Sequence, residues 1–158
     1  MLYVLYAFRR LEKSYRFAFS AVLTLVHDVV LVTGIYALLG HIFGLQVNSV
    51  FIVALLTVIG YSVNDTIVIF DRIRENQIKF PDNKYSSNIN ISINESIIRS
   101  LGTSITTLLV LFSMLILGGS TLREFIVVLI LGVIVGTYSS IFIASQFLII
   151  WEEGIKKK

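Results

Sequence analysis

The run FIVALLTVIGYSVNDTIVIFDRIREN, from Phe51 to Asn76, constrains the fold more than any other stretch of this sequence. It begins as an apolar segment long enough to cross a bilayer, which takes ~20 residues. The polar pair Asn64 and Asp65 then falls within the expected hydrocarbon layer. A charge at that depth costs ~2.5–3.5 kcal/mol even on the most permissive scale, so Asp65 is by default a candidate site for ions or protons.

The composition supports a membrane location. Apolar residues make up 56% of the chain and charged residues 15%, against about 45–50% and about 25% in soluble domains. The chain is therefore expected to be an integral, multi-pass membrane protein. It contains no cysteine, so neither a disulfide nor a thiolate metal site can form. The net charge of +3 comes from basic residues between the apolar runs, which favours a role in membrane orientation over nucleic-acid binding.

The apolar runs predict an all-α, polytopic membrane helix bundle that forms one domain over residues 1–158. Four full spans are expected, at about 17–40, 50–70, 100–119 and 125–150. Residues 1–8 are too short to span and are interpreted as the tail of a helix rather than as a signal peptide, because the basic residues follow this run. A polar loop is expected at 71–98, and Ile89, Ile93 and Ile97 in it predict an amphipathic helix at the membrane interface.

The basic residues predict the orientation. Arg123 is the one Lys or Arg expected on one side, and the other twelve of the 13 are expected on the opposite side. Because positive residues are enriched in cytoplasmic loops, the C-terminus and the 71–98 loop are predicted to face the cytoplasm or its organellar equivalent.

Asp65 and Arg99 are the leading candidates for proton chemistry. Tyr61 and Ser62 precede Asp65 by one turn and can hydrogen-bond to it, and Asn64 and Thr66 flank it. Burial and a nearby cation shift the pKa of a carboxyl group in opposite directions, so a carboxyl under both influences can exchange protons near neutral pH. The alternative is an acid that only holds helices together.

Three further groups have both a functional and a structural interpretation. Arg99 can pair with Asp65 or Glu95, or anchor the helix at the interface. Asp28 lies near mid-membrane and either takes part in the relay or forms an interhelical hydrogen bond; its neighbour His27 projects about 100° away, so the two are not expected to pair. Thr103 belongs to a hydroxyl-rich helix start whose side chains can line a hydrated path beside Arg99 or bond to carbonyls of their own helix.

Small residues at every fourth position of the last span predict a site of close helix packing. They are Gly132, Gly136, Ser140 and Ala144. No pair of His and Glu residues has metal-ligand spacing, and no cofactor or metal is expected. Intramembrane aspartyl proteases carry a GxGD signature, whereas this chain has GYSVND, so an enzyme is not expected.

Four stretches, in order, resemble the SecF members of the SecD/SecF family of protein-export membrane subunits. They are YRFAFSAVLTLVHDVVLVTGIYALLG, ALLTVIGYSVNDTIVIFDRIREN, INESIIRSLGTSITTLLVLFSMLILGG and FIVVLILGVIVGTYSSIFIASQFLI. The resemblance implies a bundle of the resistance-nodulation-division transporter type. It also implies export of proteins driven by the proton gradient, with Asp65 and Arg99 in the proton relay and Asp28 in the HD pair of the family.

The resemblance also implies partners and a location. The partners are a SecD-like subunit, the Sec translocon channel, exported unfolded polypeptides and the lipid bilayer. The location is the bacterial inner membrane or a plastid or thylakoid membrane. The family pattern places a first helix and a large extracytoplasmic domain before the helix that residues 1–8 would end. Two other functions stay open: a structural or assembly membrane protein without transport, and a related exporter of lipids or small molecules.

Overall fold

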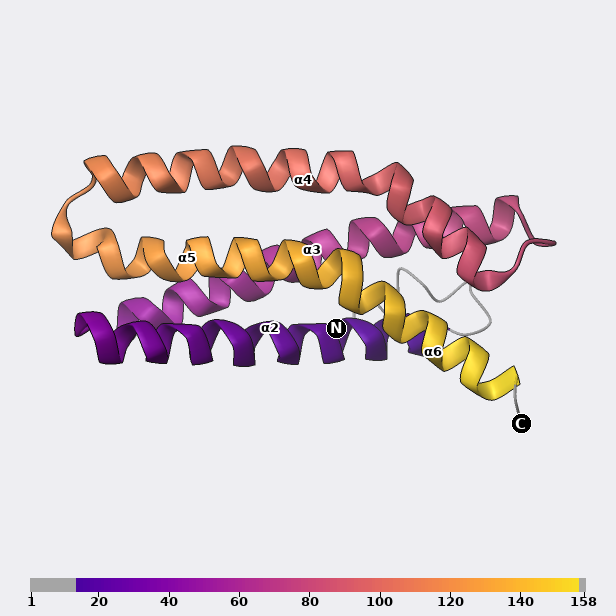
Figure 1. The fold of residues 1–158 in the computed structure, drawn as a ribbon, viewed down its shortest axis with the longest axis horizontal. Helices are drawn as coiled ribbons and strands as arrows, with labels where there is room; N and C mark the ends of the chain where they lie inside the picture. Colours follow the sequence, from indigo (N-terminus) through magenta and orange to yellow (C-terminus); the bar gives the residue numbers. More distant parts are fainter. Residues whose placement is uncertain (1–13, 157–158) are drawn as a thin grey trace.

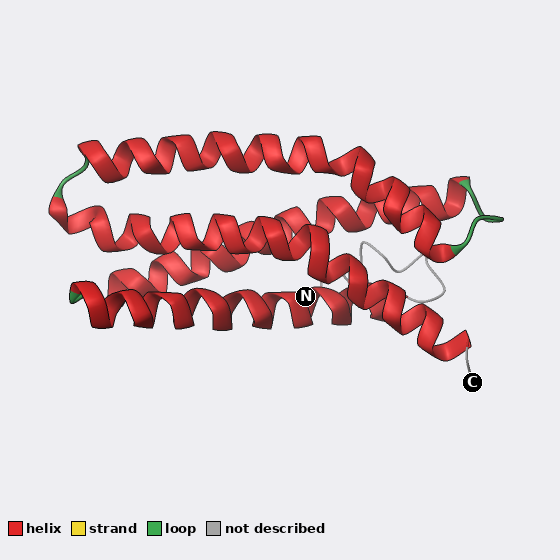
Figure 2. Ribbon diagram, in the orientation of Figure 1, coloured by secondary structure: helices red, strands yellow, loops and turns green. Residues whose placement is uncertain are grey.

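The structure is a computed structural model that describes residues 14–156, and these residues form a bundle of long helices (Figure 1). The elements are α2 (Ser14–Phe43), α3 (Ser49–Lys79), α4 (Tyr85–Leu117), α5 (Ser120–Ser139), the π-helical turn η1 (Ser140–Ala144) and α6 (Ser145–Lys156). The described chain contains no strand (Figure 2). The helix end expected at residues 1–8 lies outside the described residues.

Four helices have the length and apolar composition needed to cross a membrane. They cover Tyr15–Phe43, Ser49–Lys79, Tyr85–Leu117 and Leu122–Trp151. In hydrocarbon every backbone N–H and C=O must be paired within the protein, and a helix achieves this within one segment. The predicted all-α membrane bundle is therefore confirmed. The helices α3 and α5 form its centre, because each of them contacts α2, α4 and the other.

The segment 71–98 differs from the prediction of a polar loop with a helix at the interface. In the structure α3 continues to Lys79 and α4 begins at Tyr85, so that only a short turn separates the two helices. The isoleucine stripe does not face the bilayer interface either. Ile89 is fully buried, and Ile93 and Ile97 pack against the same apolar cluster. The amphipathic pattern thus corresponds to packing of this face against the bundle.

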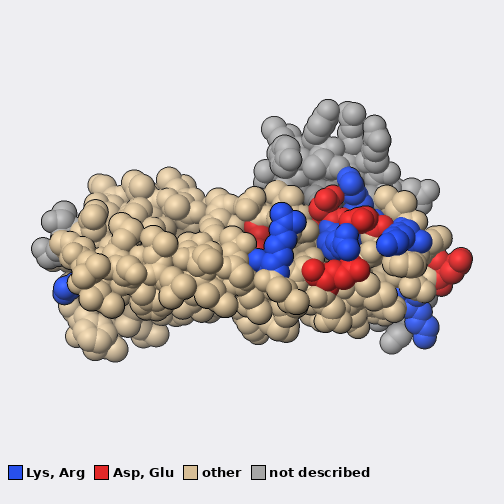
Figure 3. All heavy atoms as spheres, turned by 90° about the horizontal axis from the view of Figure 1, so that it is seen from above, with Lys and Arg blue, Asp and Glu red and all other residues tan. Residues whose placement is uncertain are grey.

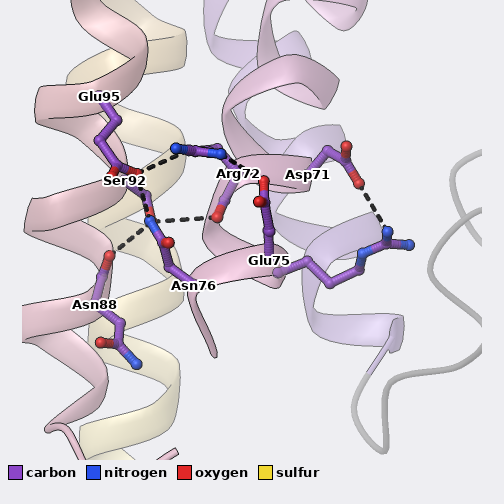
Figure 4. A network of polar contacts seen from close by, with 8 residues as sticks. Asp71, Arg72, Glu75, Asn76, Asn88, Ser92 and Glu95 are labelled. Carbon is purple, nitrogen blue, oxygen red and sulfur yellow. Dashed lines mark hydrogen bonds and ion pairs between the residues drawn. The ribbon is translucent and has the colours of Figure 1, made fainter. Parts of the chain in front are cut away.

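Polar side chains join the ends of α3 and α4 in this helical hairpin (Figure 4). Buried Asn76 donates hydrogen bonds to Ser92 Oγ at 2.9 Å and to Glu95 Oε2 at 2.7 Å. Arg72 Nε donates to the same Glu95 oxygen at 2.8 Å and forms an ion pair there. These contacts hold the two helices at a fixed register beyond their apolar parts.

Charged side chains gather over one end of the face in Figure 3, and the other end is almost free of them. The hairpin contributes the ion pairs Arg72–Glu75, Arg72–Glu95 and Arg74–Asp71 to this end. Such an asymmetry fits one end of the bundle lying in water and headgroups while the apolar remainder lies in hydrocarbon.

The opposite end of the bundle is closed by the turn between α2 and α3. Gly44 there has φ +73°, a conformation that favours glycine. Glu124 at the start of α5 accepts hydrogen bonds from Gln46 N at 3.3 Å and from Asn48 Nδ2 at 2.8 Å. Tyr36 of α2 donates to the Gln46 carbonyl at 3.1 Å. Three helices are therefore tied together at this end.

Small residues allow α5 to lie close to α3. A Cβ atom added at Gly132 would lie 2.0 Å from Val58 Cγ2, and one added at Gly136 would lie 3.2 Å from Ser62 Cβ. No side chain larger than hydrogen fits at Gly132 unless the helices move apart. Helices in lipid are not driven together by a strong hydrophobic effect, so their association depends on van der Waals contacts. The close approach at these glycines increases such contacts between α3 and α5.

The same ridge continues through the π-helical turn. Ser140 forms a hydrogen bond of 2.8 Å with Thr66 of α3, and Ala144 is fully buried in a cluster that includes Phe70. The sequence pattern predicts one uninterrupted helix here, whereas the structure has η1 between α5 and α6, which lie at an angle in Figure 1. A π-helical turn inserts extra backbone into a helix and is frequent at functional sites.

Candidate functional site

Asp65 lies in the apolar part of α3, half-buried against α4. Both oxygens of its carboxyl group contact the Ser100 hydroxyl, Oδ1 at 2.7 Å and Oδ2 at 2.9 Å. Ser100 itself is buried. A hydroxyl group can donate to an ionised carboxylate or accept from a protonated carboxyl. This partner therefore suits both protonation states of Asp65.

Ser100 belongs to a stripe of four buried serines at every fourth position of α4, which the sequence interpretation missed. The stripe consists of Ser92, Ser96, Ser100 and Ser104. Residues four apart lie on one face of a helix, and this face meets α3. The spacing was visible in the sequence, and it is the signal that would have identified Ser100 as a partner of the membrane aspartate.

Arg99 is exposed, and within residues 14–156 it forms no ion pair with Asp65 or with Glu95. Glu95 pairs with Arg72 instead. The reason is the helix geometry: consecutive residues project about 100° apart, so Arg99 points away when Ser100 faces α3. A role of Arg99 beside Asp65 stays a prediction.

The supporting polar residues predicted around Asp65 contact other helices. The Tyr61 hydroxyl lies 3.1 Å from Ser104 Oγ, and Thr66 bonds to Ser140. Ser62 faces α2, where it donates to Asp28. The side chains of α3 thus point to different neighbours around the helix, and none of these three hydrogen-bonds to Asp65 in the described structure.

Two further predicted residues, Asn64 and Thr103, lie on the exposed surface of the bundle. The Thr103 hydroxyl donates to the carbonyl of Arg99 in its own helix at 3.0 Å. Asn64 has no hydrogen-bond partner among the described side chains. An exposed amide at this depth is costly in lipid, so this surface is suited to contact with protein or water.

Asp28 is fully buried at the middle of α2. Ser62 Oγ donates to its Oδ2 at 2.5 Å, and His27 Nδ1 lies 3.1 Å from its Oδ1. The expectation that His27 and Asp28 do not pair is wrong. Although the two side chains leave the helix in different directions, both are long enough for their terminal atoms to meet.

Within residues 14–156 there is no group of three or more His, Asp or Glu side chains that could hold a metal ion. The side chains that meet at the two aspartates carry hydroxyl groups and, at Asp28, the imidazole of His27. Asp65 and Asp28 are carried by different helices and have different partners, Ser100 and Ser62. They form two separate carboxyl sites rather than one pair.

Comparison with known proteins gives one consistent result. A family model described as protein export membrane protein SecD/SecF, C-terminal, matches residues 1–154. The protein translocase subunit SecF of Thermobaculum terrenum is 44% identical over 150 residues, which are 95% of this chain and 47% of that protein. The SecF subunit of Petrotoga mobilis is 47% identical over 94% of this chain and 48% of its own length. The chain thus spans about half the length of these SecF relatives.

Longer relatives and solved structures point to the same family. The protein translocase subunit SecDF of Thermus thermophilus is 43% identical over 99% of this chain, which corresponds to 20% of that protein. A crystal structure of SecDF in a super-membrane-facing form has a TM-score of 0.88 and 42% identity, covering 99% of this chain and 20% of the other. A second, of translocon-associated SecDF from Thermus, has a TM-score of 0.84 and 43% identity over 95% of this chain and 20% of its own.

Proposed function

This chain belongs to the SecD/SecF family of protein export membrane proteins, and we propose that it is part of a proton-driven protein translocase. Its membrane bundle would use the proton gradient to assist the movement of unfolded polypeptides through a Sec translocon channel. The relatives named as translocase subunits support the first part of this proposal. The polar groups at membrane depth support the second part.

A SecD-like subunit is the proposed partner within the membrane. In the SecDF relatives, the part similar to this chain makes up 20% of a single longer polypeptide, whose name combines SecD and SecF. By analogy, SecD-like sequence, on the same or on another polypeptide, is the proposed partner of this bundle. The relatives named above are bacterial, which favours the bacterial inner membrane, with the basic end of the bundle and the C-terminus in the cytoplasm.

The observation that carries the proton proposal is the environment of Asp65. Its carboxyl lies in the apolar part of a spanning helix, is half-buried, and has the Ser100 hydroxyl as its hydrogen-bond partner among described side chains. A structural acid would be expected to have its lone pairs fully used by donors, because an unsatisfied buried carboxylate is costly. An acid that must gain and lose a proton needs a partner that tolerates both states, as a hydroxyl does.

We assign Arg99, Asn64 and Asp28 to the same relay as a proposal. Arg99 is exposed near the start of the apolar part of α4 and supplies positive charge, and Asn64 lies on the exposed surface beside Asp65. Asp28 has a second possible role, because its full burial and its bond to Ser62 also fit an acid that holds α2 against α3. In that structural role, its replacement would change stability more than translocation.

Replacing Arg99 tests how it acts. We expect Arg99→Lys to keep most of the gradient-dependent translocation and Arg99→Gln to lose it. The exposed guanidinium makes no bidentate hydrogen bond with Asp65, so we expect Arg99 to act through its positive charge, which lysine keeps and glutamine lacks. The measurement is translocation of an exported precursor into vesicles that contain the whole complex, with and without an imposed proton gradient. Arg123→Gln, at the opposite end of the bundle, is the control and should behave as wild type.

If Arg99→Lys loses as much activity as Arg99→Gln, the planar fork itself is required. Arg99 would then contact a carboxylate or phosphate bidentately in the working complex. If both variants keep the full response to the gradient, Arg99 has no part in the relay.

A further inference from the structure

Ser100 uses its hydroxyl group differently from its neighbours on α4. Serine and threonine inside a helix often donate to the backbone carbonyl four residues earlier, and the hydroxyl groups before and after Ser100 on this helix do so. They belong to Ser92, Thr103, Ser104, Thr106, Thr107 and Ser113. The corresponding acceptor for Ser100 is the Ser96 carbonyl, but its hydroxyl donates to Asp65 of α3 instead. The contact between the helices has replaced the bond within the helix.

The contact involves both oxygens of one carboxyl group and a single hydroxyl proton. Ser100 Oγ lies 2.7 Å from Asp65 Oδ1 and 2.9 Å from Oδ2, and both distances lie within the roughly 2.5–3.0 Å of an O–H···O hydrogen bond. Ser100 is buried, and within residues 14–156 no other side chain hydrogen-bonds to Asp65. The exposed Arg99 beside it on α4 forms no ion pair there. Ser100 alone therefore fixes the orientation of this carboxyl group in the described structure.

The other helices bring neutral groups or a separate acid to this level of the bundle. Within one turn of Asp65, α5 and η1 present the hydroxyl groups of Thr137 and Ser140. The titratable residues of α2 at this level are Asp28 and His27, which contact each other, and Asp28 also accepts from a serine of α3. The protonation state of Asp65 is thus met directly by the Ser100 hydroxyl.

Protonation of Asp65 reverses the direction of this hydrogen bond. An ionised carboxylate only accepts, whereas a protonated carboxyl group donates, and a hydroxyl group can serve either state. When Asp65 donates, the Ser100 oxygen accepts, and the Ser100 proton turns to another acceptor. The Ser96 carbonyl occupies the place where the neighbouring hydroxyls of α4 bond. Ser100 keeps its own proton in both states, and the proton that Asp65 binds comes from the aqueous side of the membrane.

The change of acceptor affects the helix that carries Ser100. A hydroxyl that bonds to the carbonyl four residues earlier slightly destabilises a helix and often bends it. In Figure 1, α4 changes direction between its long apolar part and the end that joins α3. The helix contains no proline that would cause this bend. Ser96 and Ser100 lie in the half of α4 that joins α3, so a hydrogen bond gained or lost between them can alter the angle of this end.

We propose that Ser100 is the positioning residue of Asp65 and that its hydroxyl transmits the protonation state of this carboxyl group to α4. It donates to the ionised carboxylate and, when Asp65 is protonated, accepts from it and donates to the Ser96 carbonyl. The inference rests on the proposed function in treating Asp65 as a proton site. The two hydrogen-bonded states themselves do not depend on translocation.

A pH titration by solid-state NMR of the whole complex in lipid bilayers tests this without a substitution. We expect the carbonyl carbon of Ser96 to shift with the same midpoint as the carboxyl carbon of Asp65. The Leu109 carbonyl, which accepts from exposed Ser113, is the reference and should not follow. A Ser96 signal that stays constant while Asp65 titrates would overturn the inference and leave the proposed function intact. An Asp65 signal that is the same at every pH would contradict both.

Variants of Ser100 test whether its hydroxyl is the connection. In Ser100→Ala we expect the Ser96 signal to stop following Asp65 and gradient-dependent translocation to fall several-fold. Ser100→Thr keeps a hydroxyl and should retain both, and Ser113→Ala is the matched control on the exposed face of α4. Unchanged translocation in Ser100→Ala, or a Ser96 signal that still follows Asp65, would contradict the inference. If Ser96 follows Asp65 in the wild type but Asp65→Asn responds normally to the gradient, the proposed function fails and this inference stands.

Discussion

Asp65→Asn is expected to abolish the part of translocation that depends on the proton gradient while the complex still assembles. Asparagine has nearly the same shape as aspartate, and its amide oxygen can still accept the hydrogen bond from Ser100. The variant therefore keeps the helix contact but cannot bind or release a proton. The expected cost to stability is only ~1 kcal/mol, the size of one altered hydrogen bond.

The measurement compares precursor translocation into vesicles with and without an imposed gradient, together with recovery of the intact complex. Thr57→Val is a matched control, because Thr57 is exposed on the same helix and its hydroxyl only bonds to the Val53 carbonyl. A normal response to the gradient in Asp65→Asn would remove Asp65 from the mechanism. Loss of assembly together with loss of activity would favour a structural acid.

Gly132→Ala is expected to destabilise the bundle by forcing α5 away from α3. The new Cβ would lie 2.0 Å from Val58 Cγ2 and 2.7 Å from Val58 Cβ, an atom held by the backbone of α3. The two helices must therefore move apart. Overpacking of this kind costs about 1–3 kcal/mol, which exceeds the roughly 0.5–1 kcal/mol gained by replacing glycine in a helix.

Unfolding of the purified complex in mixed micelles measures this effect, and two controls isolate its cause. Gly34→Ala adds the same methyl group on α2 at a position with no atom within 4 Å, so it should be neutral or slightly stabilising. Val58→Ala makes room for the new methyl group and should recover part of the loss in a double-mutant cycle. Equal effects of Gly132→Ala and Gly34→Ala would show that close packing of α5 on α3 is not required.

The fold class followed from the sequence because the membrane leaves few options. Long apolar runs must form helices to pair their backbone groups, and the four expected spans correspond to four long helices. In the segment 71–98 the helix predicted in the second half is present, but the first half is also helical up to Lys79, and contacts between distant residues, such as Asn76 with Ser92, join the two helices. The period of apolar residues carries no information about such contacts.

The candidate site was only partly predictable for the same reason. The depth of Asp65 could be read from its apolar run, but its partner depends on which helix lies beside α3. The serine stripe of α4 provides Ser100, and Ser62 turns to Asp28 on α2 instead. Likewise, the small residues of α5 predicted a close contact, whereas its location opposite Val58 emerged from the packing of the whole bundle.

In the proposed mechanism, the Asp65 carboxyl takes up and releases protons at membrane depth. Infrared spectroscopy of the reconstituted complex tests this directly, by following the carbonyl stretch of protonated carboxyl groups during a pH titration. We predict a carboxyl band that changes with pH in the wild type and is missing in Asp65→Asn. A spectrum in which Asp65→Asn removes no titrating band, so that Asp65 keeps one protonation state throughout, would contradict the account.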